Sequence, residues 1–439
     1  MSLREEAIEL LQELIRRDTV NPPGNETRAA ELLRAYLEDA GVECELYAKV
    51  PERANLVARI RGSGEGPRFL MLSHTDTVLA DPDEWSVDPW AAEVRDGHVW
   101  GRGALDMKGQ VAATAVAVAS LAREGFRPVG DLIFAACADE EMGEGEQFGL
   151  QWLIEAHPEA IQAEYAINEG AGDRVELDGR VFYLCAAAEK RSSPFRLRVR
   201  GRSGHGSMPG IADNALVKAA RLIERLAEFP PEVQIGPELE ALLRSVFGDV
   251  PTPEQALELA RAADPLAAEV VEPLFSMTVS PTMIAASEKR NVIPGVCDVT
   301  VDCRLLPGQD QDAAKRTLLD VLGDGDYEFE WTDGYGGTRS PLDTPLWHTV
   351  SSFVEQAEPG AKAVPYLVPG FTDSHWVRER FGTVAYGFFP MRMDPRLSAR
   401  LIHSADERIA IDDLALGLEF LRHAAERMGS LKTAAATRS

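Results

Sequence analysis

The sequence RFLMLSHTDTV, residues 68–78, decides the fold. A short apolar run that ends in polar residues predicts a buried β-strand with functional groups at its C-terminal end. Two similar runs lie on either side of it along the chain, Asn55–Ile60 and Asp131–Ala138, and the Ala/Val-rich segment Gly109–Leu121 is long enough for a buried helix. Strands that alternate with helices predict an α/β sheet covered by helices in the first 190 or so residues.

The pattern changes after Arg191, where Phe195–Arg200 alternates apolar and basic residues, as a strand with one wet face does. Helical and strand patterns to about residue 330 indicate a smaller α+β unit, and apolar helices and strands return from about residue 340. The smaller domain is therefore inserted into the larger one. We predict a catalytic domain in two parts, an inserted domain and a flexible tail, with boundaries at 1–192 and 334–430, 193–333, and 431–439.

The amino-acid composition argues against some classes of function. Lys and Arg total 45 against 71 Asp and Glu, so the formal net charge is -26, which argues against binding to nucleic acid or to an anionic membrane. The ordinary explanation of this charge is a well-solvated surface. Five scattered cysteines suggest neither a disulfide framework nor a thiolate zinc site, and no signal peptide or membrane span is evident. We expect a cytoplasmic protein.

Polar residues follow several of the predicted strands. His74 and Asp76 lie two apart and face one side, so Asp76 can orient a metal-binding His74. Asp106 lies in a glycine-bracketed loop before a helix, and Asp139-Glu140-Glu141 follows another strand. Each feature alone has a structural explanation, respectively a surface pair, a helix N-cap and a solvated acidic turn.

Five candidate ligands come from distant points of the chain, all at strand ends or loops of the α/β part, where the active sites of open sheets gather. Two histidines and three carboxylates suit two divalent cations, most readily Zn(II), with Co(II) or Mn(II) as alternatives. Glu140 would then take a proton from a metal-activated water as general base. The five candidates are His74, Asp106, Glu141, Glu169 and His403.

These residues resemble the M20 family of dinuclear zinc peptidases and deacylases, which includes glutamate carboxypeptidase, aminoacylase, acetylornithine deacetylase and succinyl-diaminopimelate desuccinylase. The resemblance covers nearly the whole chain. It rests on five segments in order, Ser73–Val78, Gly101–Gly109, Asp139–Gly143, Asn168–Gly170 and His403–Glu407.

The resemblance implies a zinc-peptidase-like catalytic domain with a central mixed sheet, and an inserted ferredoxin-like lid that also forms a homodimer. It places His74 and Glu169 on one metal, Glu141 and His403 on the other, and Asp106 between them. It also places Asp76 behind His74 and makes Glu140 the catalytic base.

The inserted domain resembles the family lid at Gly201–Pro209, where His205 would stabilise the oxyanion in the active site of a partner subunit. A local hydrogen bond at a glycine-flanked turn is the other explanation of His205. The resemblance further implies that Asn291 and Arg304 bind a substrate carboxylate, although a surface ion pair is also open for Arg304. Gly370 and Thr372 resemble a pocket loop, from which Phe371 departs because a small residue is usual there.

The sequence thus predicts a metal-dependent hydrolase that cuts an amide bond in a small peptide or an N-acyl amino acid. A carboxypeptidase, a dipeptidase and an aminoacylase all stay open, as does a biosynthetic deacylase of the acetylornithine or succinyl-diaminopimelate type. A noncatalytic metal- or peptide-binding scaffold is the rival from another class, and an intact Glu140 argues against it. A two-metal phosphoesterase ranks low because the ligand segments carry few cationic groups.

Overall fold

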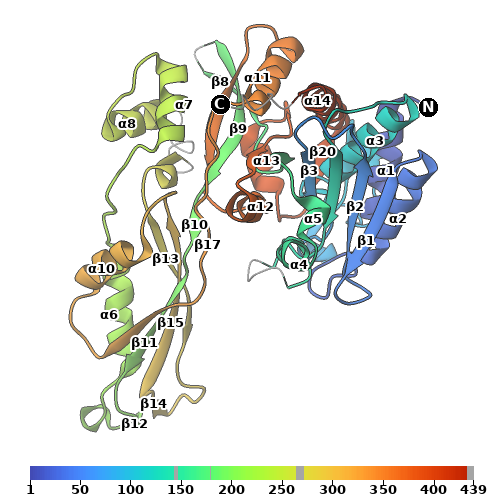
Figure 1. The fold of residues 1–439 in the computed structure, drawn as a ribbon. Coiled ribbons are helices and arrows are strands. Elements are labelled where there is room, and N and C mark those ends of the chain that lie inside the picture. The colour runs from blue at the N-terminus through green and yellow to red at the C-terminus, as the bar shows by residue number, and fades with distance from the viewer. Residues whose placement is uncertain (143–146, 178, 264–270, 433–439) are drawn as a thin grey trace, which may run out of the picture. The chain divides into compact units, whose positions relative to one another are not determined.

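The computed structural model describes residues 1–142, 147–177, 179–263 and 271–432. The chain forms two compact units, whose elements are labelled in Figure 1. Unit 1 comprises residues 1–187, 340–366 and 372–439, and unit 2 comprises residues 188–339 and 367–371. The exchange points after Ala187 and Arg339 lie several residues from the predicted boundaries, and the return to unit 2 at 367–371 was not predicted. The predicted tail 431–439 lies, after Lys432, outside the described residues.

A mixed sheet forms the centre of unit 1. Its middle strands β6, β3, β7 and β19 are parallel, and antiparallel strands adjoin them on both sides. The strands in spatial order are β1 (Glu43–Ala48), β2 (Ala54–Ile60), β6 (Leu132–Cys137), β3 (Phe69–His74), β7 (Tyr165–Asn168), β19 (Val384–Gly387), β9 (Arg180–Glu189) and β18 (Lys362–Val368), with β8 (Arg174–Leu177) paired to β9.

Strand β3 shows why this sequence forms a strand that is buried on both sides. Phe69 and Met71 join the hydrophobic cluster on one face of the sheet, while Leu70 and Leu72 join the cluster on the other face. Alternate side chains of a strand point to opposite faces, so a continuous apolar run fits only a sheet covered on both sides. Each such side chain contributes roughly 1.5–3 kcal/mol on burial.

Helices cover both faces of the unit 1 sheet, as predicted. The larger cluster includes α1 (Leu3–Ile15), α2 (Thr27–Asp39), α3 (Lys108–Arg123), α11 (Pro345–Ala357) and α14 (Ile411–Gly429). The smaller cluster includes α4 (Leu150–Ala156), α5 (Pro158–Ile161) and α12 (Ser374–Phe381). The short elements of this unit are η1 (Pro82–Glu84), α13 (Pro395–Leu401) and a small sheet of β4 (Val94–Arg95), β5 (His98–Trp100) and β20 (Arg408–Ala410).

Unit 2 contains an antiparallel sheet with two helices packed on it. Alternate residues of β11, such as Phe195, Leu197 and Val199, are buried against α6 (Ala215–Ala227) and α10 (Gln311–Leu322). The sheet comprises β16 (Tyr327–Trp331), β11 (Phe195–Arg200), β15 (Val296–Leu305), β10 (Arg191–Ser192) and β17 (Tyr335–Gly336), with β13 (Thr278–Ala285) paired to β15. A separate two-stranded antiparallel sheet pairs β12 (Gly204–His205) with β14 (Val292–Ile293).

The Pro- and Glu-rich stretch Pro230–Pro273 contains helices that the sequence analysis did not predict. α7 (Pro237–Phe247) and α8 (Pro253–Ala263) precede the short η3 (Glu272–Leu274), and η2 (Pro209–Ile211) lies earlier in the same unit. Leu239, Leu243 and Leu257 bury a small core of their own. No helix among the described residues is long and apolar enough to cross a bilayer.

Candidate metal centre

The candidate ligands gather at one edge of the unit 1 sheet. His74 ends β3, Glu141 follows β6, and Glu169 directly follows β7. Because these three strands are neighbours and parallel, their C-terminal ends meet at the same edge. Asp106 comes from the loop before α3, and His403 comes from the loop between α13 and β20.

Five side chains form two ligand groups that share one member. The first group is His74, Asp106 and Glu169, the second is Asp106, Glu141 and His403, and the ligand atoms within each group all lie within 4.8 Å of one another. Asp106 Oδ1 is 3.2 Å from His74 Nε2, and Asp106 Oδ2 is 3.1 Å from His403 Nε2. The two oxygens of Asp106 therefore face different histidines, as a carboxylate that bridges two cations requires.

The chemistry of these groups fits two divalent cations. Three carboxylates crowd a largely buried space, and burial, together with the Asp106 carboxylate, raises the pKa of Glu141 to about 7. Glu141 Oε1 is buried and has no hydrogen-bond partner among the described residues. A buried carboxylate oxygen without a donor is costly unless a cation completes its surroundings. Nitrogen and carboxylate ligands without thiolate suit Zn(II) and similar ions.

His74 is oriented by the backbone as well as by Asp76. The side chain is only 1% exposed, and its Nδ1 lies 3.1 Å from the carbonyl oxygen of Asp76 and 3.5 Å from Asp76 Oδ1. A proton donated from Nδ1 leaves Nε2 with a free lone pair for a metal. The carboxylate of Asp76 instead accepts hydrogen bonds from the backbone N–H groups of Glu140 and Glu141, at 3.2 and 3.1 Å.

Glu140 has the surroundings of a proton acceptor. Burial, with the negative charges of Glu169, Glu141 and Asp373, raises its pKa well above the ordinary value, against the opposing effect of His74. A carboxylate whose pKa approaches neutrality is a better general base at physiological pH than an ordinary one. Glu141, the next residue, belongs to the second ligand group.

Glu407 is a part of this site that the sequence analysis missed as a functional residue. Its carboxylate is fully buried and accepts hydrogen bonds from the backbone N–H groups of Gly103, Leu105 and Asp106, at 2.7–3.0 Å. It also pairs with Arg102 at 2.7 Å. Glu407 therefore ties the loop that carries Asp106 to the segment that carries His403. An acid four residues after a candidate ligand histidine was the available signal.

The structure places the residues predicted for substrate in two different regions of unit 2. His205 lies in β12 and Asn291 directly precedes β14, which pairs with β12; both residues are exposed, and His205 Nδ1 lies 2.8 Å from Ser207 Oγ. Arg304 makes 2.9–3.2 Å contacts with both carboxylate oxygens of Asp302, and its guanidinium lies 5.9 Å from the Phe371 ring.

Gly370 and Thr372, the two residues that resemble a pocket loop, belong to different units. Gly370 belongs to unit 2, whereas Thr372 belongs to unit 1, where it is buried and its hydroxyl accepts a hydrogen bond from Ser374 N at 3.2 Å. The structure therefore describes each of these residues within its own unit, and their substrate roles stay predictions.

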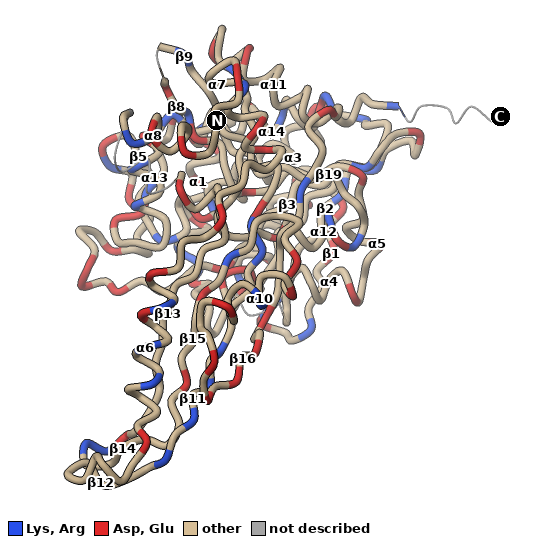
Figure 2. The backbone as a smooth tube through the Cα atoms, turned by 90° about the vertical axis from the view of Figure 1, so that its left-hand side faces the viewer, with Lys and Arg blue, Asp and Glu red and all other residues tan. Residues whose placement is uncertain are grey.

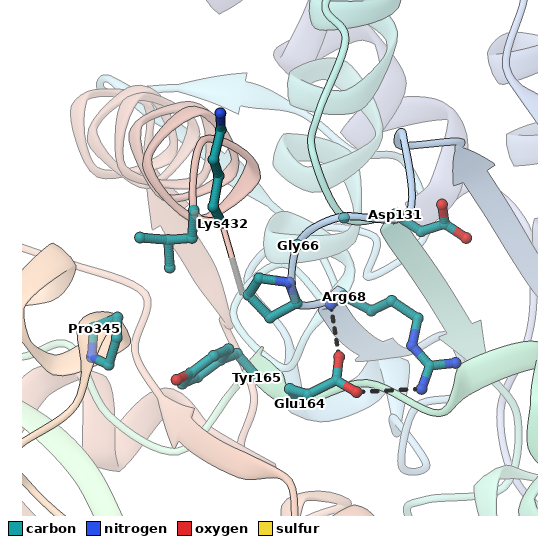
Figure 3. Close-up of a pocket in the computed structure, with 11 residues that line it drawn as sticks. Gly66, Arg68, Asp131, Glu164, Tyr165, Pro345 and Lys432 are labelled. Atoms are coloured by element: carbon teal, nitrogen blue, oxygen red, sulfur yellow. Dashed lines mark hydrogen bonds and ion pairs between the residues drawn. The ribbon is translucent and has the colours of Figure 1, made fainter. Parts of the chain in front are cut away.

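Among the residues that the structure describes, neither the distribution of charge nor the hollow described next indicates a second metal site. Acidic residues are spread along the chain and interspersed with basic ones (Figure 2). A hollow of about 620 Å³ lies beside Arg68 and Tyr165, at the starts of β3 and β7 (Figure 3). These are the strand ends opposite to the ligands, and Arg68 there is already paired with Glu164 at 3.3 Å.

The chain matches known proteins over most of its length. Over 229 residues it is 34% identical to succinyl-diaminopimelate desuccinylase of Parvibaculum lavamentivorans, which covers 50% of this chain and 54% of that protein. It is 26% identical over 393 residues to human N-fatty-acyl-amino acid synthase/hydrolase PM20D1, which covers 85% of this chain and 76% of that protein. The first of these matches thus spans only about half of the relative's length.

Solved structures and a family model agree with these relatives. The fold is similar to an M20 family metallo-carboxypeptidase, Sso-CP2, from Sulfolobus solfataricus, with a TM-score of 0.73 and 18% identity over 97% of this chain and 99% of that one. The model of peptidase family M20/M25/M40 matches residues 70–427. Since this match includes every candidate metal ligand and most of both units, the chain belongs to peptidase family M20/M25/M40.

Proposed function

We propose that this protein hydrolyses an amide bond in a small peptide or an N-acyl amino acid, with Glu140 as general base. One observation carries the proposal. Two ligand groups share Asp106, and the residue directly before the ligand Glu141 is a carboxylate with a raised pKa. A noncatalytic scaffold would not need the carboxylate of Glu140, because the other five residues already form both ligand groups.

Asp76 and Glu407 orient residues that we propose bind two divalent cations. Asp76 lies beside His74 and accepts the N–H of Glu141, and Glu407 fixes the loop that carries Asp106. We assign His74 and Glu169 to one cation, Glu141 and His403 to the other, and Asp106 to both, with Zn(II) as the proposed metal and Co(II) or Mn(II) as alternatives. When bound, such ions polarise the scissile carbonyl and lower the pKa of water. Family membership supports metal dependence, and the identity of the metal is our proposal.

Glu140 moves the proton in the proposed reaction. Its carboxylate accepts a proton from the attacking water and returns that proton to the leaving nitrogen. The raised pKa favours the first half of this task, because it makes the Glu140 carboxylate a stronger proton acceptor. The backbone N–H of Glu140 is fixed by Asp76, which limits the directions in which the side chain can point.

Unit 2 supplies the proposed groups for the rest of the substrate. Arg304 presents a planar fork of N–H donors, which matches the two oxygens of a carboxylate. It would exchange Asp302 for the carboxylate of the substrate. Asn291 and Gly370 of unit 2, and Thr372 of unit 1, are the other residues that we propose for substrate binding. Phe371, whose ring lies beside the Arg304 guanidinium, would then contact the leaving group.

The first test is a substrate panel assayed with metal-free enzyme and with added Zn(II), Co(II) or Mn(II). The panel contains dipeptides, N-acetyl, N-succinyl and long-chain N-acyl amino acids, and N-succinyl diamino acids. We expect metal-dependent release of an amino acid from at least one class. The similarity to a desuccinylase makes the N-succinyl diamino acids the alternative to test beside peptides. No release from any member by enzyme with two bound metals would favour the scaffold.

A homodimer through unit 2 is also part of the proposal. On β13, Met283 and Ile284 are 68% and 50% exposed, and among the described strands β13 pairs only with β15. Val217 on α6 is 49% exposed. An exposed edge strand with apolar side chains is favourable for pairing with a second copy. The five cysteines are widely spread along the sequence without a close pair, which supports the proposed cytoplasmic location.

A mixed-dimer experiment tests whether His205 acts in the partner subunit. We expect His205→Ala to lower kcat by roughly 10²–10³-fold, the usual effect of losing one oxyanion donor. When His205→Ala and Glu140→Gln chains are co-expressed in equal amounts, a mixed dimer contains one site with Glu140 and a partner's His205. Random pairing should therefore restore about a quarter of wild-type activity, although each parent is nearly inactive. No recovery in isolated mixed dimers would place His205 outside the partner's site.

A further inference from the structure

A continuous chain of buried polar side chains lies behind the metal centre in unit 1. Asp76, Asn21, Asp139, Arg53 and Glu26 contact one another in this order, and none is more than 7% exposed. Buried charged groups are retained only where partners compensate their lost hydration. The proposed reaction does not use Asn21, Arg53 or Glu26, so these contacts call for a separate explanation.

Asn21 connects the two aspartates. Its Nδ2 donates to Asp76 Oδ2 at 2.9 Å and to Asp139 Oδ1 at 3.0 Å, which uses both hydrogens of the amide nitrogen. Its backbone N–H donates to the carbonyl oxygen of Thr77 at 2.9 Å, and Thr77 N donates to the carbonyl of Thr19 at 3.2 Å. The amide of Asn21 is therefore held in place from both its backbone and its side chain.

Asp139 adopts a conformation that its neighbours impose. Its φ is 65°, in the left-handed region that residues other than glycine rarely occupy. Its carboxylate accepts hydrogen bonds from Asn21, from Arg53 Nη2 at 2.8 Å and from Phe148 N at 3.1 Å, while its own N–H donates to Glu26 Oε1 at 3.3 Å. The direction in which the chain leaves β6 toward Glu140 and Glu141 depends on this conformation.

Arg53 is the cation that joins the two acids at the end of this chain. Its Nε and Nη2 donate to the two oxygens of Glu26 at 2.5 and 2.7 Å, and Nη2 also contacts Asp139. A lysine could not make this planar two-point contact. A Cβ atom on Gly24, whose φ is +101°, would lie 2.1 Å from Arg53 Nε, so the turn after Asn21 packs directly over the guanidinium.

We propose that Asn21, Glu26 and Arg53 are positioning residues of the hydrolytic reaction. They hold Asp139 in its left-handed conformation, and Asp139 in turn directs Glu140 and Glu141, the proposed base and a proposed metal ligand. Asn21 also fixes Asp76, whose carboxylate accepts the N–H groups of the same two glutamates. This inference rests on the proposed function, because it assigns the network to the orientation of that site and not only to stability.

The test compares Arg53→Lys and Asn21→Ala with a matched control, Arg59→Lys, on the strand that Arg53 directly precedes. Arg59, in β2, also forms a largely buried ion pair, with Asp131 at 2.7 Å. Asp131 directly precedes β6, so this pair lies at the end of β6 opposite to the candidate metal ligands. Each protein is loaded with Co(II), and four quantities are measured. These are the melting temperature of the metal-free form, the Co(II) content, the Co(II) absorption spectrum, and kcat and KM per folded, loaded chain.

We expect Arg53→Lys and Asn21→Ala to lower kcat by about 10–100-fold and to alter the Co(II) spectrum. KM should stay within about threefold of wild type, because the substrate contacts are not changed. Arg59→Lys should lower the melting temperature and leave kcat and the spectrum at wild-type values. Asn21→Ala leaves the ion pairs of Arg53 with Glu26 and Asp139 in place, so it answers the question even if Arg53→Lys does not fold.

The inference is overturned if both variants, once folded and loaded, show the wild-type kcat and spectrum and differ only in melting temperature. That result would make the network a stability element. Failure of the proposed function looks different, because wild type itself would then hydrolyse no amide. The Co(II) spectra of the variants would still decide whether the network orients the metal ligands.

Discussion

Glu140→Gln is expected to bind both metals and to lose roughly 10²–10⁴-fold of kcat, the range usual for removal of a general base. Glutamine has nearly the shape of glutamate, so the backbone contact of residue 140 with Asp76 should persist. The amide cannot accept a proton from water, so the rate of the chemical step should fall while metal binding is retained. Steady-state kinetics together with metal analysis measure both quantities on the same sample.

The informative comparison for this variant is Glu141→Gln, one residue away. Glu141 belongs to a ligand group whereas Glu140 does not, so Glu141→Gln should lose metal as well as activity. The substitutions are chemically identical and the residues are adjacent, which removes position and charge as explanations. Wild-type turnover by metal-loaded Glu140→Gln would show that another group takes the proton.

Asp106→Ala should have the largest effect on metal binding. Asp106 belongs to both ligand groups, and its two oxygens face different histidines, so its removal weakens both metal positions at once. We expect metal content to fall from about two ions per chain toward zero, and activity to fall with it. Plasma mass spectrometry after gel filtration gives the stoichiometry directly.

Glu169→Ala is the matched control for the bridging role. Glu169 belongs to one ligand group only, so the variant should keep about one ion per chain, bound by the other group. Equal metal loss from Asp106→Ala and Glu169→Ala would contradict the bridging assignment. Burial and the nearby Asp106 carboxylate raise the pKa of Glu169, whereas, despite burial, contacts with His403 and His74 lower the pKa of Asp106, so the two removals should affect the metal-free fold differently. The melting temperature of each metal-free variant therefore has to be measured beside its metal content.

Much of unit 1 was predictable because its signals are local. Strand β3 is a continuous apolar run that ends at a histidine, and this pattern alone gives both the strand and the position of the site. The mixed sheet covered by helices is confirmed, and family membership confirms a peptidase or related amidohydrolase. The helix predicted over Gly109–Leu121 lies within α3 (Lys108–Arg123).

What the sequence did not reveal depends on contacts between distant segments. Arg53 looks like any surface arginine until Glu26 and Asp139 are found on either side of it. Glu407 looks like part of an acidic pair until three N–H groups of a distant loop converge on its carboxylate. The helices α7 and α8 were missed because prolines and glutamates dominate their segment, and a small core that forms only on folding stabilises them. No spacing along the chain encodes such partnerships.

The position of β19 has a consequence for how the protein is made. This strand, Val384–Gly387, lies between β7 and β9 in the sheet of unit 1, although it is among the last strands to be synthesised. His403 follows it later still. During translation the nascent chain can complete almost all of unit 2 while unit 1 still lacks an interior strand and a metal ligand. The proposed metal site therefore gains its last ligand, His403, only late in translation, and shorter nascent fragments should lack the proposed activity.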